Sequence, residues 1–332
     1  RRFNKHNVGG MLLYTQREYK NDVLPSRNQG VSGRATYDYD QRYLFEFNFG
    51  YNGTERLGKG DRFEFFPAVS LGWLVSNEKF FEPLSDVVSS LKLRGSYGLV
   101  GSDETGPSGA PHFLYIDQVQ VTGNGRPGFT TGENLNVSYY GPVVQQWAVQ
   151  NGGWERVKKL DVGFDMELFR ELSITFDFFY DKRYNILLHR EAWPQSLGFH
   201  EAKPWSNKGK VDNWGYEVST NWRKQLTKDL TVDFRGTFTY TQNKYIDLDE
   251  PIYPYVWQTA TGKPLNRRTG YIAEGLFQSQ EEIDNSPTQN LGSKPMPGDI
   301  KYRDVDGNGL IDSKDQVMIS KTAGMPRIQY NR

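Results

Sequence analysis

Apolar and polar residues alternate along many segments of this chain, as they must in a β-strand that has one apolar and one polar face. The clearest segment covers residues 43–51, where aromatic residues occupy every second position and polar residues such as Glu46 and Asn48 lie between them. An α-helix would scatter these rings around its whole circumference. The pattern therefore predicts a strand.

Further segments have the same pattern and a similar length. They are residues 11–19, 66–75, 91–99, 160–168, 172–180, 209–222 and 230–240. A tilted strand that crosses a membrane needs about 9–11 residues, whereas strands of globular domains are typically about 5–6 residues long. Their length favours membrane-spanning strands, and the short Arg170-Glu171 segment predicts that two of them form a hairpin.

The connections between these segments fall into two length classes. The short ones are residues 170–171 and 225–229, and the long ones are 101–155, 184–208 and 247–299. Short turns on one side and long loops on the other are typical of outer-membrane barrels, while such loops would be unusual in a soluble domain. Apart from a helical turn near residues 78–84, we find no helix with an apolar stripe. The chain is predicted to be all-β, a transmembrane antiparallel β-barrel segment over residues 1–332.

The composition agrees with this fold class. Only 36% of the 332 residues are hydrophobic and the mean hydropathy is -0.70, yet 14% are aromatic. Disordered chains are poor in aromatic residues and usually carry net charge, whereas 40 basic and 40 acidic residues cancel here. No run approaches the roughly 20 apolar residues of a transmembrane helix. Because the chain has no cysteine, it has no disulfides and no thiolate metal sites.

Residues 304–315 match the calcium-binding loop of an EF-hand, with glycine at the sixth position. The candidate ligands are Asp304, Asp306, Asn308, Leu310 through its carbonyl, Asp312 and Asp315. The last position holds Asp instead of the bidentate Glu, which predicts a lower affinity. The flanks lack amphipathic helices, so this is no paired sensor EF-hand. A loop that turns through side chain to backbone hydrogen bonds without a metal is the alternative, and the sequence leaves both open.

The sequence gives no support to catalysis. Residues 53–60 resemble a phosphate-binding loop, but Gly60 replaces the Ser or Thr that would hold magnesium, and a strand follows instead of a helix. No nucleophile elbow or zinc-protease motif is present. The histidines are far apart, at His6, His112, His189 and His200. We therefore predict no catalytic residues and no cofactor other than structural calcium, and the balanced charge argues against nucleic-acid binding.

Aromatic residues in the long loops are candidate substrate contacts, because the faces of aromatic rings often hold sugars and peptides. The candidates are Trp154, Trp193, Trp205, Tyr253, Tyr255 and Trp257. The alternative is that these rings anchor the barrel at the membrane interface or pack within the loops.

Three stretches of the chain resemble the SusC/RagA family of TonB-dependent outer-membrane transporters. The first is RYLFEFNFGYNG over residues 42–53, continuing to FPAVSLGW over 66–73. The second is LKLRGSYG over 91–98, followed by Gly101-Ser-Asp103, and the third is GDIKYRDVDGNG over 298–309. Their order and spacing agree with the family, so the resemblance spans most of the chain.

The resemblance implies a barrel of about 22 strands that is plugged by an N-terminal domain and covered by a SusD-like surface lipoprotein. It also implies TonB-driven import of glycan or peptide oligomers across the outer membrane of a Gram-negative bacterium. A family member would begin with the plug, through which TonB acts, and would end with further strands that close the barrel. Neither is present in this sequence, and residues 1–7 are polar and basic with no apolar segment after them, as a signal peptide would need. We therefore expect a fragment that lies against outer-membrane lipid.

Two alternatives come from other classes of protein. One is a secreted all-β carbohydrate-binding or adhesion module with a structural calcium loop, which would be soluble without detergent. The other is an all-β glycan hydrolase, which would need two carboxylates about 5–9 Å apart in a cleft.

Overall fold

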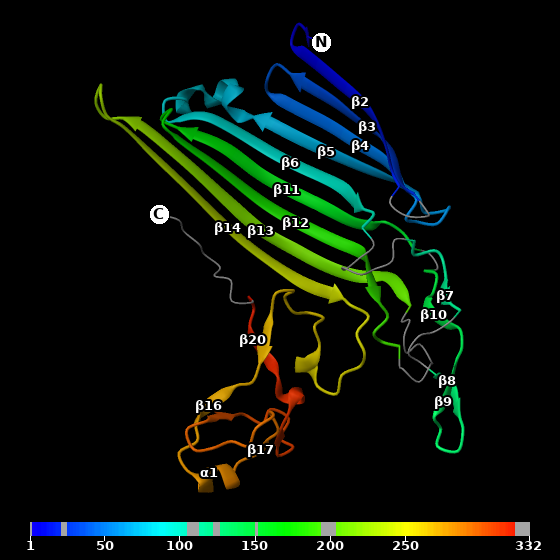
Figure 1. The fold of residues 1–332 in the computed structure, drawn as a ribbon. Helices are drawn as coiled ribbons and strands as arrows, with labels where there is room; N and C mark the ends of the chain where they lie inside the picture. Colours follow the sequence, from blue (N-terminus) through cyan, green and yellow to red (C-terminus); the bar gives the residue numbers. More distant parts are fainter. Residues whose placement is uncertain are drawn as a thin grey trace. The chain divides into compact units, whose positions relative to one another are not determined.

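A computed structural model describes residues 2–20, 25–104, 113–121, 127–149, 152–193 and 204–322. Ten strands of this part form one sheet in the order β1-β2-β3-β4-β5-β6-β11-β12-β13-β14 (Figure 1). Their bounds are β1 Arg2–Phe3, β2 His6–Tyr19, β3 Ser26–Tyr39, β4 Tyr43–Thr54, β5 Phe63–Leu74, β6 Val88–Ser102, β11 Glu155–Leu168, β12 Leu172–His189, β13 Trp205–Gln225 and β14 Thr231–Asp247. Consecutive strands from β1 to β13 pair antiparallel.

The strands are longer than those of most globular sheets. Strands β2, β3 and β11 each have 14 residues, β12 has 18 and β13 has 21. Each of them exceeds the roughly 9–11 residues that a membrane-spanning strand needs. The predicted strands at 160–168 and 172–180 form the expected hairpin of β11 and β12, in which Leu168 pairs with Leu172.

Strand β3 is one that the sequence pattern did not predict. Its apolar face includes the small residues Gly33 and Ala35, so its alternation is weak. Phe49 of β4 lies directly opposite Gly33, and a β-carbon on that glycine would be 2.3 Å from the Phe49 ring. Because a neighbouring ring covers this position, β3 needs no large apolar side chain of its own there.

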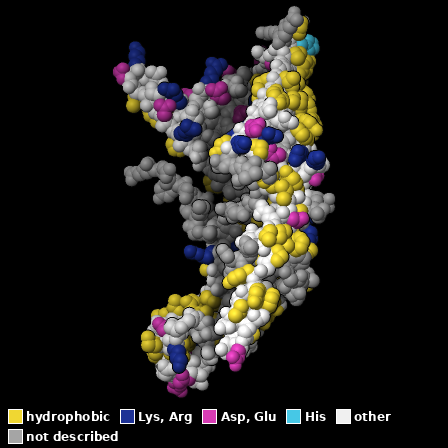
Figure 2. All heavy atoms as spheres, turned by 45° about the vertical axis from the view of Figure 1, so that its right-hand side comes forward, with side chains coloured by type: hydrophobic (Ala, Val, Ile, Leu, Met, Phe, Trp, Pro, Cys, Tyr) yellow, Lys and Arg dark blue, Asp and Glu magenta, His cyan; other side chains and the backbone are white. Residues whose placement is uncertain are grey.

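The register places the apolar positions of neighbouring strands on one face of the sheet. Phe164 of β11 lies opposite both Leu93 of β6 and Phe176 of β12, and the two phenylalanine rings stack 5.5 Å apart. Side chains on this face are exposed, including Leu71 at 61% and Tyr97 at 54%. Figure 2 shows hydrophobic side chains in patches along the strands. An apolar face of this extent marks a membrane or interaction surface.

One end of the sheet, which we call the turn edge, carries the tight connections of residues 4–5, 40–42, 169–171 and 226–230. Residues 75–87, which join β5 and β6 at this edge, form a longer connection. Phe169 and Arg170 both have positive φ, 55° and 61°, and such turns follow the twist of paired strands. The predicted helical turn is also here, as the 3-10 helices η1 (Val75–Asn77) and η2 (Lys79–Leu84).

The opposite end, the loop edge, carries the longer connections. Strands β6 and β11 are joined by residues 103–154, and β12 and β13 by residues 190–204. Both lie inside the ranges 101–155 and 184–208 that the sequence suggested. The first contains short strands, β7 Gln118–Gln120, β8 Pro127–Thr131, β9 Val137–Tyr140 and β10 Val143–Gln146.

The chain divides into two compact units, and the sheet belongs to the unit of Arg1–Gln242 and Asp247–Asp249. The second unit is Asn243–Ile246 with Glu250–Arg332, and its described part is built from short elements. These are η4 Val256–Gln258, β15 Arg268–Gly270, β16 Ala273–Leu276, α1 Gln280–Asp284, β17 Thr288–Gln289, β18 Ile300–Tyr302, β19 Leu310–Ile311, η5 Ser313–Asp315 and β20 Val317–Ser320. Phe277 and Ile311 are its most buried apolar side chains, at 2% and 1% exposure. Within the described residues, no helix is long and apolar enough to cross a membrane.

Candidate functional site

The loop of residues 304–315 lies in the second unit between β18 and β20. Its backbone bends at Gly307 and Gly309, whose φ values of 73° and 81° favour glycine. The Asp304 carboxylate accepts hydrogen bonds from both glycine N–H groups, at 2.8 and 2.7 Å. Ile311, buried at 1% exposure, anchors the loop through β19, which pairs with β17. The local sequence therefore fixes the turn that brings the acidic residues together.

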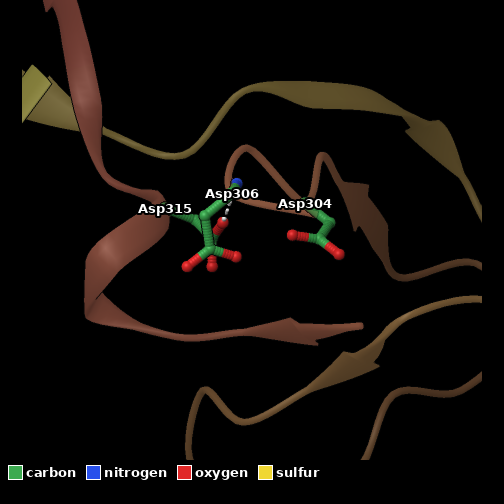
Figure 3. Close-up of side chains that lie close together, drawn as sticks. All are labelled: Asp304, Asp306 and Asp315. Atoms are coloured by element: carbon green, nitrogen blue, oxygen red, sulfur yellow. Dashed lines mark hydrogen bonds between the residues drawn. The ribbon is translucent and has the colours of Figure 1, made fainter. Parts of the chain in front are cut away.

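Three carboxylates converge inside this loop. Atoms of Asp304, Asp306 and Asp315 lie within 4.8 Å of one another (Figure 3). Asp315 is fully buried, and its oxygens accept from the Val305 N–H at 2.7 Å and the Asp312 N–H at 2.9 Å. These bonds offset part of the cost of burying a carboxylate, but neighbouring negative charges still repel. Hard oxygen donors at this spacing fit a cation such as Ca²⁺.

The hydrogen bonds of Asp304 also keep it ionised. The Gly309 N–H, followed by those of Gly307 and Asn308, lowers the pKa of the Asp304 carboxyl below its usual range. A carboxyl group with a lowered pKa stabilises the folded state above its unfolded pKa of about 3.9 and loses this effect as pH falls through the lower folded value. The Asp304 carboxyl is therefore charged throughout the neutral range.

Two of the other predicted ligands make local turns, and the Asn308 side chain also donates to Asp306 Oδ2 at 2.9 Å. Asn308 Oδ1 accepts from the Leu310 N–H, and Asp312 Oδ1 accepts from the Lys314 N–H, each at 2.7 Å. Three of the four acidic predicted ligands are thus brought together, and side chain to backbone turns of the metal-free alternative are also present. In the described part of the chain, this trio is the one acidic group found with metal-ligand spacing.

Two of the candidate substrate contacts, Tyr255 and Trp257, are attached to this same loop. Their rings stack in parallel with centroids 4.6 Å apart. Trp257 Nε1 donates to the Lys314 carbonyl at 2.7 Å, and the Tyr255 hydroxyl is hydrogen-bonded to Asp306, which raises the pKa of Tyr255. The sequence contained no signal for this contact, because about fifty residues separate the partners. The aromatic pair is therefore hydrogen-bonded to the loop that carries the acidic group.

The remaining aromatic candidates have different environments. Tyr253 is 38% exposed, and the Arg190 guanidinium lies 5.1 Å from the Trp193 ring centroid. Trp205 contacts His189, with 3.6 Å between ring centroids, and packs against a buried cluster. That cluster consists of Leu114, Val149 and Leu187. These aromatic side chains therefore contact neighbouring residues and remain partly exposed to solvent.

The burial of Trp154 disagrees with the prediction that this residue contacts the substrate. Its side chain is only 5% exposed and packs against Leu57 and Phe66, with the Phe66 ring edge-on at 5.3 Å. Its Nε1 donates to the Arg62 carbonyl at 3.2 Å. Because the ring is buried and its N–H group is hydrogen-bonded within the protein, Trp154 packs the loop edge and presents almost no surface to a ligand.

A charged network on the polar face of the sheet was missed by the sequence reasoning. Arg94 of β6 forms a bidentate ion pair with Asp177 of β12, with N···O distances of 2.6 and 2.7 Å. Its Nε and Nη1 also lie 3.2 and 3.4 Å from Asp165 and Asp161 of β11. Gly163 lies opposite Arg94 in the register and leaves room for this crossing. The alternation of charged and apolar residues over 160–168 is visible in the sequence. That these charged residues meet Arg94 and Asp177 follows only from the register of the neighbouring strands.

The comparisons with known proteins agree on one family. Residues 3–292 match the family model described as TonB dependent receptor-like, beta-barrel. The chain is 29% identical over 337 residues to the TonB-dependent receptor SusC of Bacteroides thetaiotaomicron, covering 95% of this chain and 31% of that protein. It is 27% identical over 328 residues to the TonB-dependent receptor P3 of Formosa agariphila, covering 94% and 30%.

Among solved structures, the RagAB peptide importer in its closed-closed state has the same fold. The similarity has a TM-score of 0.70 at 16% sequence identity and covers 97% of this chain and 36% of the importer chain. The chain spans about 30% of the length of the curated relatives that it matches.

Proposed function

Because the chain belongs to the TonB-dependent receptor β-barrel family, we propose that it is the wall segment of an outer-membrane importer of glycan or peptide oligomers. The family match confirms the predicted all-β transmembrane barrel and the outer-membrane location. It is a family of receptors and transporters, which supports the prediction of a non-enzyme and disfavours the glycan hydrolase. A secreted binding module is disfavoured for the same reason.

The observation that carries the proposal is the division of the sheet into two chemically distinct faces. Leu71 and Tyr97 lie on the apolar face, which meets lipid in a barrel, while Arg94, Asp161 and Asp177 lie on the polar face, which lines the lumen. A charged wall keeps the lumen hydrated and suits polar cargo such as sugars or peptides. The RagAB peptide importer supports peptide oligomers as one cargo class. Glycan oligomers are the second class that the resemblance to the SusC/RagA family implies.

The relatives that are named TonB-dependent receptors support TonB as the source of energy, and the resemblance to the SusC/RagA family implies a SusD-like surface lipoprotein as a partner. The test is to delete the gene for the complete receptor and to compare growth on panels of oligosaccharides and of peptide digests. We expect a growth defect on one panel that plasmid-borne receptor restores, and co-extraction of a lipoprotein in mild detergent. Normal growth on every oligomer, with uptake of the labelled oligomers unchanged, would contradict the proposal.

We also propose that Asp304, Asp306 and Asp315 hold a structural Ca²⁺ ion in the second unit. Calcium would offset most of the negative charge of three adjacent carboxylates. The hydrogen bond from Tyr255 to Asp306 would link the Tyr255–Trp257 pair to the ordered site. With Asp at the last ligand position, we expect a dissociation constant of about 10⁻⁴–10⁻³ M, the range of extracellular modules.

Calorimetric titration of Ca²⁺ into the complete receptor tests this site. The Asp304→Asn/Asp306→Asn variant is expected to bind one Ca²⁺ fewer and to be cut faster by protease in the second unit. Asp284→Asn, on the exposed helix α1, should leave both readouts unchanged. Because the pKa of Asp304 is lowered, binding should persist from pH 7 to pH 5. Equal calcium stoichiometry in all three proteins would favour the metal-free loop.

A further inference from the structure

A row of aromatic rings follows the turn edge on the apolar face of the sheet. Its ring centroids are 5.1 Å apart between His6 and Tyr39, 6.4 Å between Tyr39 and Tyr43, and 6.5 Å between Tyr43 and Trp73. The next ring, Phe80, lies 6.4 Å from Trp73 and is on helix η2, beyond the end of β5. The aromatic row therefore continues from the strands onto the connection between β5 and β6.

One carboxylate of the connection accepts hydrogen bonds from three side chains of these strands and their turn. Glu78 Oε1 accepts from the Tyr43 hydroxyl at 2.8 Å and from Trp73 Nε1 at 3.2 Å, while Oε2 accepts from Arg42 at 3.3 Å. The Glu78 side chain is only 12% exposed. These bonds direct the polar ends of Tyr43 and Trp73 toward the turn edge, and they fix the start of η2 beside the apolar face.

The two phenylalanines of η2 differ sharply in exposure. Phe81 is 4% exposed and anchors the helix, whereas its neighbour Phe80 is 64% exposed. Leu84, at the end of η2, is 54% exposed. Moving a side chain of this size from water to an apolar environment is favourable. The helix is held in a fixed position. Its exposed Phe80, beside Trp73, forms an apolar surface that is available to a partner.

We infer that η2 is a membrane-interface element, with Phe80 and Leu84 inserted among the phospholipids of the leaflet at the turn edge. Lipid is the expected occupant because Trp73 shares its face with Leu93, its partner in the register. The inference rests on the proposed function, in which this face of the barrel wall meets lipid. Tyr and Trp with apolar bodies and polar tips are typical of the membrane boundary. Lys79, exposed beside Phe80, can extend its ammonium group to the lipid phosphates. The helix would set the depth of this part of the wall.

Site-directed spin labelling can test this placement, because the 332 residues contain no cysteine. The complete receptor, with any cysteines elsewhere replaced by serine, would carry Phe80→Cys and a nitroxide label in phosphatidylethanolamine and phosphatidylglycerol vesicles. Power saturation then compares collisions with oxygen, which is concentrated in lipid, and with a water-soluble nickel chelate. We expect an oxygen-to-nickel ratio several-fold higher for Phe80→Cys than for Glu82→Cys on the same short helix. Leu71→Cys on the apolar face is the lipid-exposed reference.

Two outcomes would overturn the inference. A ratio for Phe80→Cys equal to that of Glu82→Cys would place the helix in water. Low collision rates with both reagents would mean that protein, not lipid, covers Phe80. Should Phe80→Cys lose the heat-dependent gel mobility of a folded barrel, Leu84→Cys gives a second measurement with the same expected result.

Discussion

Replacing Arg94 with alanine is expected to destabilise the barrel wall by roughly 2 kcal/mol, one of the two largest effects predicted for this chain. The change leaves the carboxylates of Asp161, Asp165 and Asp177 together without the guanidinium that pairs with all three. Removing one partner of a fully buried ion pair costs about 3–5 kcal/mol. The expected loss is smaller because the Arg94 and Asp177 side chains remain 29% and 20% exposed. Urea unfolding of the complete receptor in micelles, followed by tryptophan fluorescence, measures it.

The matched control is Arg223→Ala at the turn-edge end of β13. Arg223 pairs with Asp233, but their side chains are 74% and 58% exposed, so the cost should stay below about 1 kcal/mol. Arg94→Ala combined with Asp177→Ala should cost less than the sum of the two single changes, since both remove the same interaction. Equal unfolding midpoints for Arg94→Ala and the unchanged receptor would mean that water already screens the network.

Replacing Gly163 with alanine is expected to be at least as damaging, at about 2–3 kcal/mol, because the new methyl group meets main-chain atoms. Its β-carbon would lie 2.3 Å from the Phe176 carbonyl oxygen, 2.5 Å from an Asp177 carboxylate oxygen and 3.3 Å from the Asp177 α-carbon. Backbone atoms in a paired strand cannot rotate away as the end of a flexible side chain can. Relief of the contact therefore requires β11 and β12 to separate locally, which also moves Asp177 away from Arg94. The same urea titration reports the loss.

Gly95→Ala provides the comparison within the same part of the sheet. Gly95 pairs with Val162, and its added β-carbon would meet its nearest atoms at 3.8 and 3.9 Å, which is ordinary contact. We expect a change of less than about 1 kcal/mol there. If Gly95→Ala and Gly163→Ala shifted the unfolding midpoint equally, close packing between β11 and β12 would not be the cause.

The sequence by itself determined the features that depend on short-range repetition. Alternation with a period of two identified most strands of the sheet, because successive side chains of any strand point to opposite faces. The residues of the 304–315 loop predicted its acidic turn, because Asp304 bonds to the nearby Gly307 and Gly309. Family motifs also lie within single strands and turns, so they could be read without knowing which strands pair.

Only the tertiary structure decided which residues distant in sequence meet. Arg94 and Asp177 are 83 positions apart, and their contact depends on the register of three strands. The burial of Trp154 against Phe66 could not be read from its own surroundings in the sequence. Strand β3 escaped detection because Phe49 of the next strand covers Gly33. Alternation specifies which face a residue occupies, whereas hydrogen-bond register and packing specify its neighbours, and no local pattern encodes those.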